Sequence, residues 1–179
     1  MTEHIASGPP VVVRLAEYTG ADVEQILGAG EDHFGVAYTG LSWLPKDIHF
    51  GVRDAGGRLL AHAGLLRLPL TAGGVDLEVM GVGGVAVAPE ARGRGLARAV
   101  VGAALDHART SGAQHALLFC RPPLAGLYRR LGFREVADDV HVEQPEGRVV
   151  LMPLRTMRAP LAGGGGWPEG PVRLRSLPM

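Results

Sequence analysis

The chain has 179 residues, 46% of them hydrophobic and 20% charged, a composition typical of one globular domain with a sizeable buried core. Its 18 basic residues (Lys and Arg) balance its 18 acidic residues (Asp and Glu), which argues against general nucleic-acid binding. No apolar run approaches the ~18 residues that a membrane span requires, so we expect no membrane partner.

The N-terminal part predicts a strand, a short helix and a glycine-rich segment. Residues 1–10, MTEHIASGPP, lack the basic and apolar regions of a signal peptide, and we therefore expect a cytoplasmic protein. Residues 11–18 alternate like a strand, and Thr19 with Asp22 predicts the capping box of a short helix. Residues 31–47 are rich in glycine, and we expect a mobile loop or helical segment there.

The central part predicts a sheet with one covering helix. Residues 48–54, 58–70 and 75–88 are strand-like runs joined by glycine-containing turns, which predicts an antiparallel meander. Residues 96–109 carry an apolar stripe at helical spacing, and residues 115–120, HALLFC, predict a buried strand. The fold class is therefore mixed α/β, with a largely antiparallel sheet and one strand–helix–strand crossover at its centre.

A second helix and a hairpin are expected to end the domain. Pro122 and Pro123 open this helix, and Gly132 ends it in the left-handed conformation. Residues 134–144 and 147–154, separated by a turn, predict a final hairpin.

The remaining residues predict a tail. Residues 159–179 are rich in Gly and Pro and predict a flexible segment, unless Trp167 docks on the domain. We therefore expect one domain over residues 1–158, followed by a tail over residues 159–179. The single cysteine, Cys120, excludes an internal disulfide and a cysteine-based zinc site, and we expect no metal site.

Charge is divided unevenly along the chain. Residues 1–91 hold eleven acidic and five basic residues, whereas residues 92–134 hold eight arginines and one acidic residue. We therefore expect the middle segment to bind an anion and the acidic N-terminal half to favour a cation.

The stretch VAVAPEARGRGLARAVV, residues 85–101, connects a strand to a helix through Arg92, Gly93, Arg94 and Gly95. The start of a helix leaves backbone N–H groups without partners at the positive end of the helix dipole. Glycines let this backbone close around phosphate oxygens, and arginines add charge-assisted hydrogen bonds. The chain lacks the GK[ST] of a P-loop and an early dinucleotide fingerprint, so ATP and NAD are poor candidates for the anion.

This turn resembles motif A of the GNAT acyltransferase superfamily, in which Gln or Arg is followed by two residues, Gly, one residue, and Gly or Ala. Arg92, Gly95 and Ala97 match that pattern, and a second family hallmark, LYRRLGF, follows at residues 127–133. The resemblance runs from about Val11 to Leu154. It implies the GNAT fold, a mostly antiparallel mixed sheet that splays at the cofactor site and is flanked by helices.

The resemblance also implies an acetyl-CoA-dependent N-acetyltransferase. The pyrophosphate is expected on the amides of residues 92–97, and the pantetheine arm beside the preceding strand. Arg121 stands where relatives often have Asn, and we expect it to reach the anionic cofactor. The expected cofactor-binding residues are Val85, Ala86, Val87, Arg92, Gly93, Arg94, Gly95, Leu96, Ala97 and Arg121.

The resemblance implies a general acid more clearly than a general base. Tyr128 matches the family's general acid, which protonates the departing thiolate, and a backbone N–H near Val85 is expected to polarise the carbonyl. Many relatives carry a glutamate on the strand before motif A, but Gly81 and Gly83 occupy the corresponding positions here.

Several groups remain candidates for the base. Glu78 is a carboxylate close by on the same strand, although strand alternation points it to the opposite face unless a bulge intervenes. His62, Asp32 and His33 are further candidates, as is a water chain that leads to solvent.

The expected acceptor is the primary amine of a small, cationic molecule, which Glu31, Asp32 and Asp47 would attract. An amino-acid-like metabolite, an aminoglycoside, as in the aminoglycoside 2'-N-acetyltransferases, and a protein N-terminus are alternatives. A domain that binds acyl-CoA without turnover is the alternative from another functional class. A homodimer is also considered.

Overall fold

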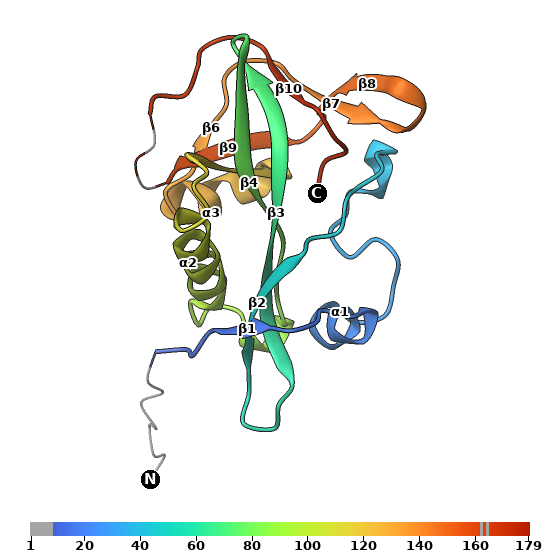
Figure 1. Cartoon of the computed structure of the whole chain (residues 1–179). Coiled ribbons are helices and arrows are strands. Elements are labelled where there is room, and N and C mark those ends of the chain that lie inside the picture. Colours follow the sequence, from blue (N-terminus) through green and yellow to red (C-terminus); the bar gives the residue numbers. More distant parts are fainter. Residues whose placement is uncertain (1–8, 162, 164) are drawn as a thin grey trace.

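A computed structural model describes residues 9–161, 163 and 165–179, and a curved ten-stranded sheet organises these residues (Figure 1). The strands are β1 (Val13–Leu15), β2 (Ile48–Arg53), β3 (Leu59–Ala72), β4 (Val75–Val87), β5 (His115–Cys120), β6 (Arg134–Glu135), β7 (Val140–Gln144), β8 (Arg148–Leu151), β9 (Arg155–Pro160) and β10 (Val172–Leu174). The α-helices are α1 (Gly20–Leu27), α2 (Leu96–Arg109) and α3 (Ala125–Arg130), and short 3-10 helices are η1 (Ala37–Thr39), η2 (Pro89–Ala91), η3 (Pro122–Leu124) and η4 (Pro145–Gly147).

The strands lie in the order β6-β9-β5-β4-β3-β10-β7-β8, and β2 pairs with β3 and with β1. The predicted meander is confirmed, because β2, β3 and β4 pair antiparallel in succession. The predicted crossover is also confirmed, since α2 connects β4 to the parallel strand β5. The mixed α/β class therefore follows from the pattern of the central residues.

A β-bulge interrupts the pairing of β3 with β4. The pair His62–Ala86 is followed by the pair Gly64–Gly83, so β4 holds one residue more than β3 over this stretch. Gly84 lies inside the bulge with φ of +60°, a left-handed conformation that suits glycine. The bulge changes which side chains of β4 face each side of the sheet from this point onward.

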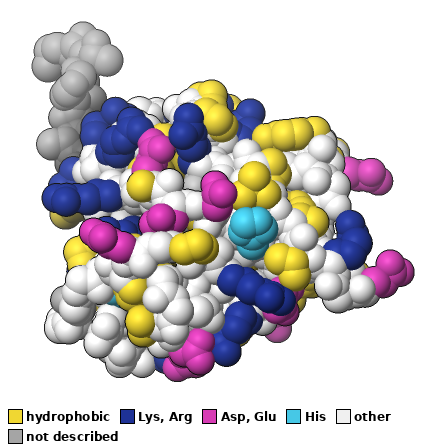
Figure 2. Space-filling model, turned by 90° about the horizontal axis from the view of Figure 1, so that it is seen from above, with side chains coloured by type: hydrophobic (Ala, Val, Ile, Leu, Met, Phe, Trp, Pro, Cys, Tyr) yellow, Lys and Arg dark blue, Asp and Glu magenta, His cyan; other side chains and the backbone are white. Residues whose placement is uncertain are grey.

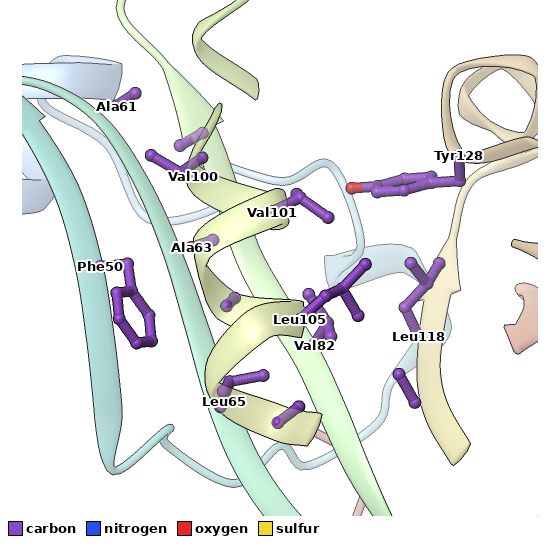
Figure 3. Packing of buried hydrophobic residues seen from close by; sticks show 14 of the residues in the cluster. Phe50, Ala61, Ala63, Leu65, Val82, Val100, Val101, Leu105, Leu118 and Tyr128 are labelled. Carbon is purple, nitrogen blue, oxygen red and sulfur yellow. The ribbon is translucent and has the colours of Figure 1, made fainter. Parts of the chain in front are cut away.

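The amphipathic helix α2 covers one face of the sheet. Its buried residues recur at helical spacing and are Leu96, Val100, Val101, Ala104, Leu105 and Ala108. Figure 3 shows Val100 and Val101 beside side chains of the central strands, with Ala63 and Val82 among them. Burial of a large apolar side chain stabilises the fold by roughly 1.5–3 kcal/mol, so this stripe fixes α2, and the turn that precedes it, on the sheet.

The structure corrects the prediction for residues 134–154. The hairpin of β7 and β8 is present, but residues 134–135 do not extend β7. They form β6, which pairs with β9 at the other end of the sheet. β9 runs antiparallel to β5 and buries Met157, and the sequence pattern did not reveal it.

The structure also corrects the domain boundary at residue 158, because β9 crosses it. The described residues of the predicted tail belong to the domain: β10 lies between β3 and β7, antiparallel to the first and parallel to the second. Trp167 does dock, with its ring edge-on to His115 at 5.2 Å between centroids and the guanidinium of Arg158 5.2 Å above it. A flexible tail is therefore the wrong description of these residues.

Charges are mixed on the face shown in Figure 2, where Lys and Arg side chains are interspersed with Asp and Glu side chains. Among the helices that the structure describes, none combines the length and the apolar character needed to span a bilayer. Within residues 9–161, 163 and 165–179, no cluster of three or more His, Cys, Asp or Glu residues could bind a metal ion.

Candidate active site

Strands β4 and β5 separate partway along their length. They pair from Val79 with His115 to Gly81 with Leu117, and beyond these pairs β4 pairs only with β3, and β5 only with β9. A cavity of about 280 Å³ opens where they separate. It is lined by Phe34, Val36, Trp43, Lys46, Val82, Gly83, Gly84, Val85, Phe119, Cys120, Arg121, Leu124, Tyr128, Leu154 and Met179.

The segment between α1 and β2, which we predicted to be mobile, forms one wall of the cavity. The carboxylate of Asp32 accepts hydrogen bonds from the N–H groups of Val36 and Ala37 at 2.8 and 3.1 Å. The N–H of Leu44 donates to the carbonyl oxygen of Pro178 at 2.6 Å. The bonds to Asp32 order the segment itself, and the bond to Pro178 joins it to the C-terminal residues.

Tyr128 reaches the cavity from α3. Its side chain is 7% exposed and lies edge-on to Phe133, with 6.0 Å between ring centroids. Gly132, at φ of +94°, turns the chain so that the N–H of Phe133 donates to the carbonyl oxygen of Tyr128 at 3.0 Å. Figure 3 shows the hydroxyl directed away from α3 towards α2. Burial, and to a lesser degree Cys120, raises the pKa of Tyr128, so the hydroxyl keeps its proton at neutral pH.

The Arg/Gly turn, residues 92–95, leads directly into α2. Gly95 caps the helix in a left-handed conformation, with φ of +74° and no side-chain hydrogen bond. The first N–H that bonds within the helix is that of Ala99, so the preceding N–H groups of the first turn lack intrahelical partners. A Cβ at Gly93 or Gly95 would meet no atom within 4 Å, so the space above the turn is open to a ligand.

The two arginines of the turn support its backbone. Arg92 donates from Nε to the carbonyl oxygen of Val87 at 3.3 Å, and Arg94 donates to that of Glu90 at 3.2 Å. Both side chains are exposed, and their positive charge adds to that of the helix end. The turn therefore fits the phosphate groups of a nucleotide-containing cofactor.

The remaining expected cofactor residues lie on the path from the cavity to this turn. Val85 and Arg121 line the cavity, and the Arg121 guanidinium lies 3.4 Å from where a Cβ at Gly35 would be. Ala86 is buried, and Val87 ends β4 just before η2 and the turn.

Glu78, the expected base on β4, lies outside the cavity. It is opposite Pro69, five residues before Gly83, and its Oε2 is 3.2 Å from the guanidinium of Arg67. The bulge at Gly84 comes after Glu78 along the strand, so it does not redirect this side chain. The assignment of Glu78 as the base is wrong for this geometry.

His62 is close to the cavity, but both of its ring nitrogens are engaged. Nδ1 lies 2.8 Å from the carbonyl oxygen of Gly84, and Nε2 lies 3.0 Å from Nδ1 of His49. Because a carbonyl only accepts, Nδ1 of His62 carries the proton. The ring stacks on Tyr18 at 3.5 Å, and burial lowers the pKa of His62 to about 4. His62 therefore holds the bulge and is not free to act as a base.

The other acidic and basic candidates from the N-terminal half also lie elsewhere. His33, Glu31, Asp32 and Asp47 do not line the cavity, and Asp32 is used to cap the wall segment. The residues that line the cavity all belong to the part of the chain that the structure describes. Two of them, Lys46 and Arg121, have charged side chains.

Sequence reasoning missed Lys46. Its side chain crosses Gly64 and Gly83. An added Cβ at Gly64 would lie 2.8 Å from Cγ of Lys46, and one at Gly83 would lie 2.6 Å from its Cε. Burial lowers the pKa of its amine. A compositional signal was present, since Lys46 is the chain's one lysine beside seventeen arginines.

The comparison with protein families assigns the chain that forms this site to a family. The family of the acetyltransferase (GNAT) domain matches residues 19–136, which include the Arg/Gly turn and the residues that line the cavity apart from Leu154 and Met179. The chain belongs to the GNAT family. It is a GNAT N-acetyltransferase with acetyl-CoA as its co-substrate, as the resemblance of Arg92, Gly95 and Ala97 to motif A implied.

Relatives of this GNAT acetyltransferase support the assignment. Glucosamine 6-phosphate N-acetyltransferase 1 from Oryza sativa subsp. japonica is 29% identical over 135 residues, which cover 75% of this chain and 72% of that protein. The GNAT family N-acetyltransferase YhbS from Escherichia coli, crystallised with CoA, superposes with a TM-score of 0.63 at 21% identity, over 96% of this chain and 94% of that one. The ribosomal-protein-S18-alanine N-acetyltransferase from E. coli superposes with a TM-score of 0.55 at 19% identity, over 87% and 97% of the two chains. These structures share the GNAT fold with this chain.

Proposed function

We propose that this acetyltransferase transfers the acetyl group of acetyl-CoA to the primary amine of a small molecule bound between β4 and β5. The observation that carries this proposal is the position of Tyr128, a buried and protonated hydroxyl in the wall of the cavity. The cavity, about 280 Å³, has the size of a small-molecule site.

The Arg/Gly turn and the first turn of α2 would hold the pyrophosphate of acetyl-CoA. Gly93 and Gly95 leave the backbone bare, and the helix dipole favours an anion there. The backbone of residues 85–87 would lie along the pantetheine arm, at the edge that β4 exposes after it leaves β5. Acetyl-CoA supplies an activated thioester, so the residues need only position the amine, polarise the carbonyl and move protons.

Tyr128 would donate a proton to the departing thiolate, and its raised pKa keeps that proton available. The N–H of Val85 would polarise the thioester carbonyl. Among the described residues no carboxylate side chain lines the cavity, so we propose that the amine loses its proton through water to solvent.

The acceptor is proposed to be a small amine, with an amino-acid-like molecule as the first candidate. The named acceptor of the rice relative is an amino-sugar phosphate, and this class is a second candidate. Both classes combine an amine with a negative group, as a cavity with Lys46 and Arg121 favours. A cationic acceptor such as an aminoglycoside receives less support, because Glu31, Asp32 and Asp47 do not line the cavity.

The test is release of free CoA thiol from acetyl-CoA in the presence of amino acids, amino-sugar phosphates, aminoglycosides and simple amines. We expect amine-dependent thiol release and an acetylated product that mass spectrometry identifies. Binding of acetyl-CoA without turnover for every amine would instead support the alternative of an acyl-CoA-binding domain. A cytoplasmic location and a homodimer stay predictions.

A further inference from the structure

The amine of Lys46 lies at the point where β4 leaves β5. An added Cβ at Gly83 would lie 3.2 Å from Nζ and 2.6 Å from Cε of Lys46, so the end of the lysine side chain rests against this glycine. Gly83 comes two residues after the last pair between the strands, that of Gly81 with Leu117. The ammonium group is therefore placed in the wall of the cavity and not at the surface of the protein.

Lys46 has no ionic partner within the part of the chain that the structure describes. No carboxylate of these residues lies within 4.0 Å of Nζ. Burial lowers the pKa of the amine, because desolvation disfavours the charged form. A partly buried ammonium without a counter-ion is unfavourable, and an anion that enters the cavity would relieve this cost.

The titratable side chains around Lys46 do not neutralise it, and the other polar group beside it is a main-chain oxygen of Met179, 3.5 Å from the position of an added Cβ at Gly83. From β3, His62 stays neutral because burial lowers its pKa to about 4. From β2, burial also lowers the pKa of His49. Asp47, next in the chain, is exposed and lies outside the cavity, and Arg121 adds a second positive charge to the lining.

We propose that Lys46 binds an anionic group of the acceptor, a carboxylate or a phosphate, so that the enzyme selects small amines that also carry a negative charge. The inference rests on the proposed function, because it assigns the acceptor to the cavity beside Tyr128. It replaces the cationic acceptor that the charge division along the chain predicted.

The strand geometry limits the size of this acceptor. Gly83 lies beside Nζ, and Val85, the proposed carbonyl-polarising residue, lies two residues further along β4. Two strand residues span about 7 Å, and the bulge at Gly84 shortens that path. The amine and the anion of the acceptor must therefore be close together in the same small molecule.

The structure also explains why a lysine stands here in a chain that otherwise uses arginine. The methylene groups of Lys46 cross Gly64 and Gly83 so closely that a Cβ at either glycine would lie within 2.8 Å of a side-chain carbon. This path accommodates an unbranched chain with a compact ammonium at its end, whereas the planar guanidinium of arginine is broader.

The test compares matched acceptors that differ in the negative group. Phenylalanine is compared with phenylalaninamide for the carboxylate, and glucosamine 6-phosphate with glucosamine for the phosphate. We expect kcat/KM to be higher for the charged member of at least one pair by roughly 10- to 100-fold, the range expected for hydrogen bonds to a charged group. The pair that shows the preference identifies the anion.

The Lys46→Met variant keeps the length of the side chain and removes its charge. We expect the preference for the charged acceptor over its neutral partner to be lost, mainly through a higher KM for the charged acceptor. Asp47→Asn is the matched control, since it changes a neighbouring charge outside the cavity and should leave both acceptors unaffected. Calorimetric titration of the charged acceptor should show the same loss of affinity in Lys46→Met without any turnover.

Three results would overturn the proposal. Equal kcat/KM within both pairs, or a preference for the neutral members, would show that no anion is bound. A fall in kcat for charged and neutral acceptors alike in Lys46→Met would make Lys46 a base. A Lys46 peptide that gains the mass of an acetyl group during turnover would make it a nucleophile. If no amine of the wider panel is acetylated, the proposed function fails as well, whereas turnover without charge preference overturns only the role of Lys46.

Discussion

His62 on β3 donates from Nδ1 to the carbonyl oxygen of Gly84 on β4 at 2.8 Å, and this bond closes the bulge beside the cavity. His62 is fully buried, and its stacking on Tyr18 fixes the plane of the ring. The position of Val85, the next residue, therefore depends on a side chain that does not itself line the cavity.

Replacement His62→Phe keeps an aromatic ring for the stack on Tyr18 but removes the donor to Gly84. A carbonyl that loses its partner costs about 1–3 kcal/mol when it is buried, and Gly84 is partly buried, so we expect urea unfolding to show a loss of up to that size together with a lower kcat. His49→Phe is the control, because it removes the partner of Nε2 and leaves the bond to Gly84. Equal effects of the two variants on kcat would contradict this role for His62.

The same histidine predicts how stability depends on pH. Its pKa is lowered from 6.5 to about 4 in the folded protein, so between these values the unfolded chain binds more protons. The contribution of neutral His62 to the free energy of unfolding is present above pH 6.5. It is lost as the pH falls towards 4, by roughly 3 kcal/mol at most. Denaturant titrations of the wild type at several pH values should show this loss, and those of His62→Phe should show a smaller one. Parallel pH curves for both proteins would contradict the prediction.

Tyr128→Phe removes the proposed general acid and leaves the ring packed against Phe133. We expect kcat to fall by roughly 10²- to 10⁴-fold, with the Kd of acetyl-CoA and the melting temperature almost unchanged. Steady-state thiol release and calorimetry measure these quantities. Full activity in the variant would leave Tyr128 with a packing role alone.

Gly95→Val is expected to abolish stabilisation by acetyl-CoA, because it places a branched side chain on the Arg/Gly turn at φ of +74°. In the wild type, saturation at about 100 times Kd should add about 2.7 kcal/mol of apparent stability. Gly102→Ala is the control within α2: a Cβ there meets no atom within 4 Å, and we expect a gain of about 0.5–1 kcal/mol with the ligand effect intact. A normal shift of the melting temperature by acetyl-CoA in Gly95→Val would argue against the turn as the phosphate site.

Gly73 and Gly74 test whether the C-terminal segment is part of the fold. Both have positive φ in the turn between β3 and β4, but only at Gly73 would an added Cβ collide with the segment, 2.1 Å from the carbonyl oxygen of Glu169. Gly73→Ala should therefore destabilise the protein clearly more than Gly74→Ala in urea unfolding. Equal losses would show that residues around Glu169 do not pack there in solution.

The central fold and the cofactor turn could be predicted from the sequence because their signals are local. The alternation of β2 to β4, the stripe of α2 and the residues Arg92 to Gly95 each lie within a short window. The short strand β10 could not be predicted, since three residues carry no measurable periodicity and its partners, β3 and β7, lie far away in the chain. β9 was missed because two arginines and a terminal proline obscure its pattern.

The residues of the candidate site were predictable only in part. Tyr128 follows from a motif that is continuous in sequence, but the position of Lys46 depends on the register of three strands and on two glycines, Gly64 and Gly83, that leave room for it. We predicted Glu78 as the base because it is close to Gly83 in the sequence. Its carboxylate pairs with Arg67 at a point on β4 that precedes the bulge, outside the cavity.

The insertion of β10 between β3 and β7 has a consequence for biosynthesis. The β7–β8 hairpin joins the sheet through β10. It therefore cannot pair with the rest of the sheet until residues 172–174 have left the ribosome. β3 likewise presents an unpaired edge at residues 70–72 until then, and such edges promote aggregation. A nascent chain that stalls before these residues should therefore carry an incomplete sheet and depend on chaperones, even though the meander and the crossover that hold the cofactor turn are already synthesised.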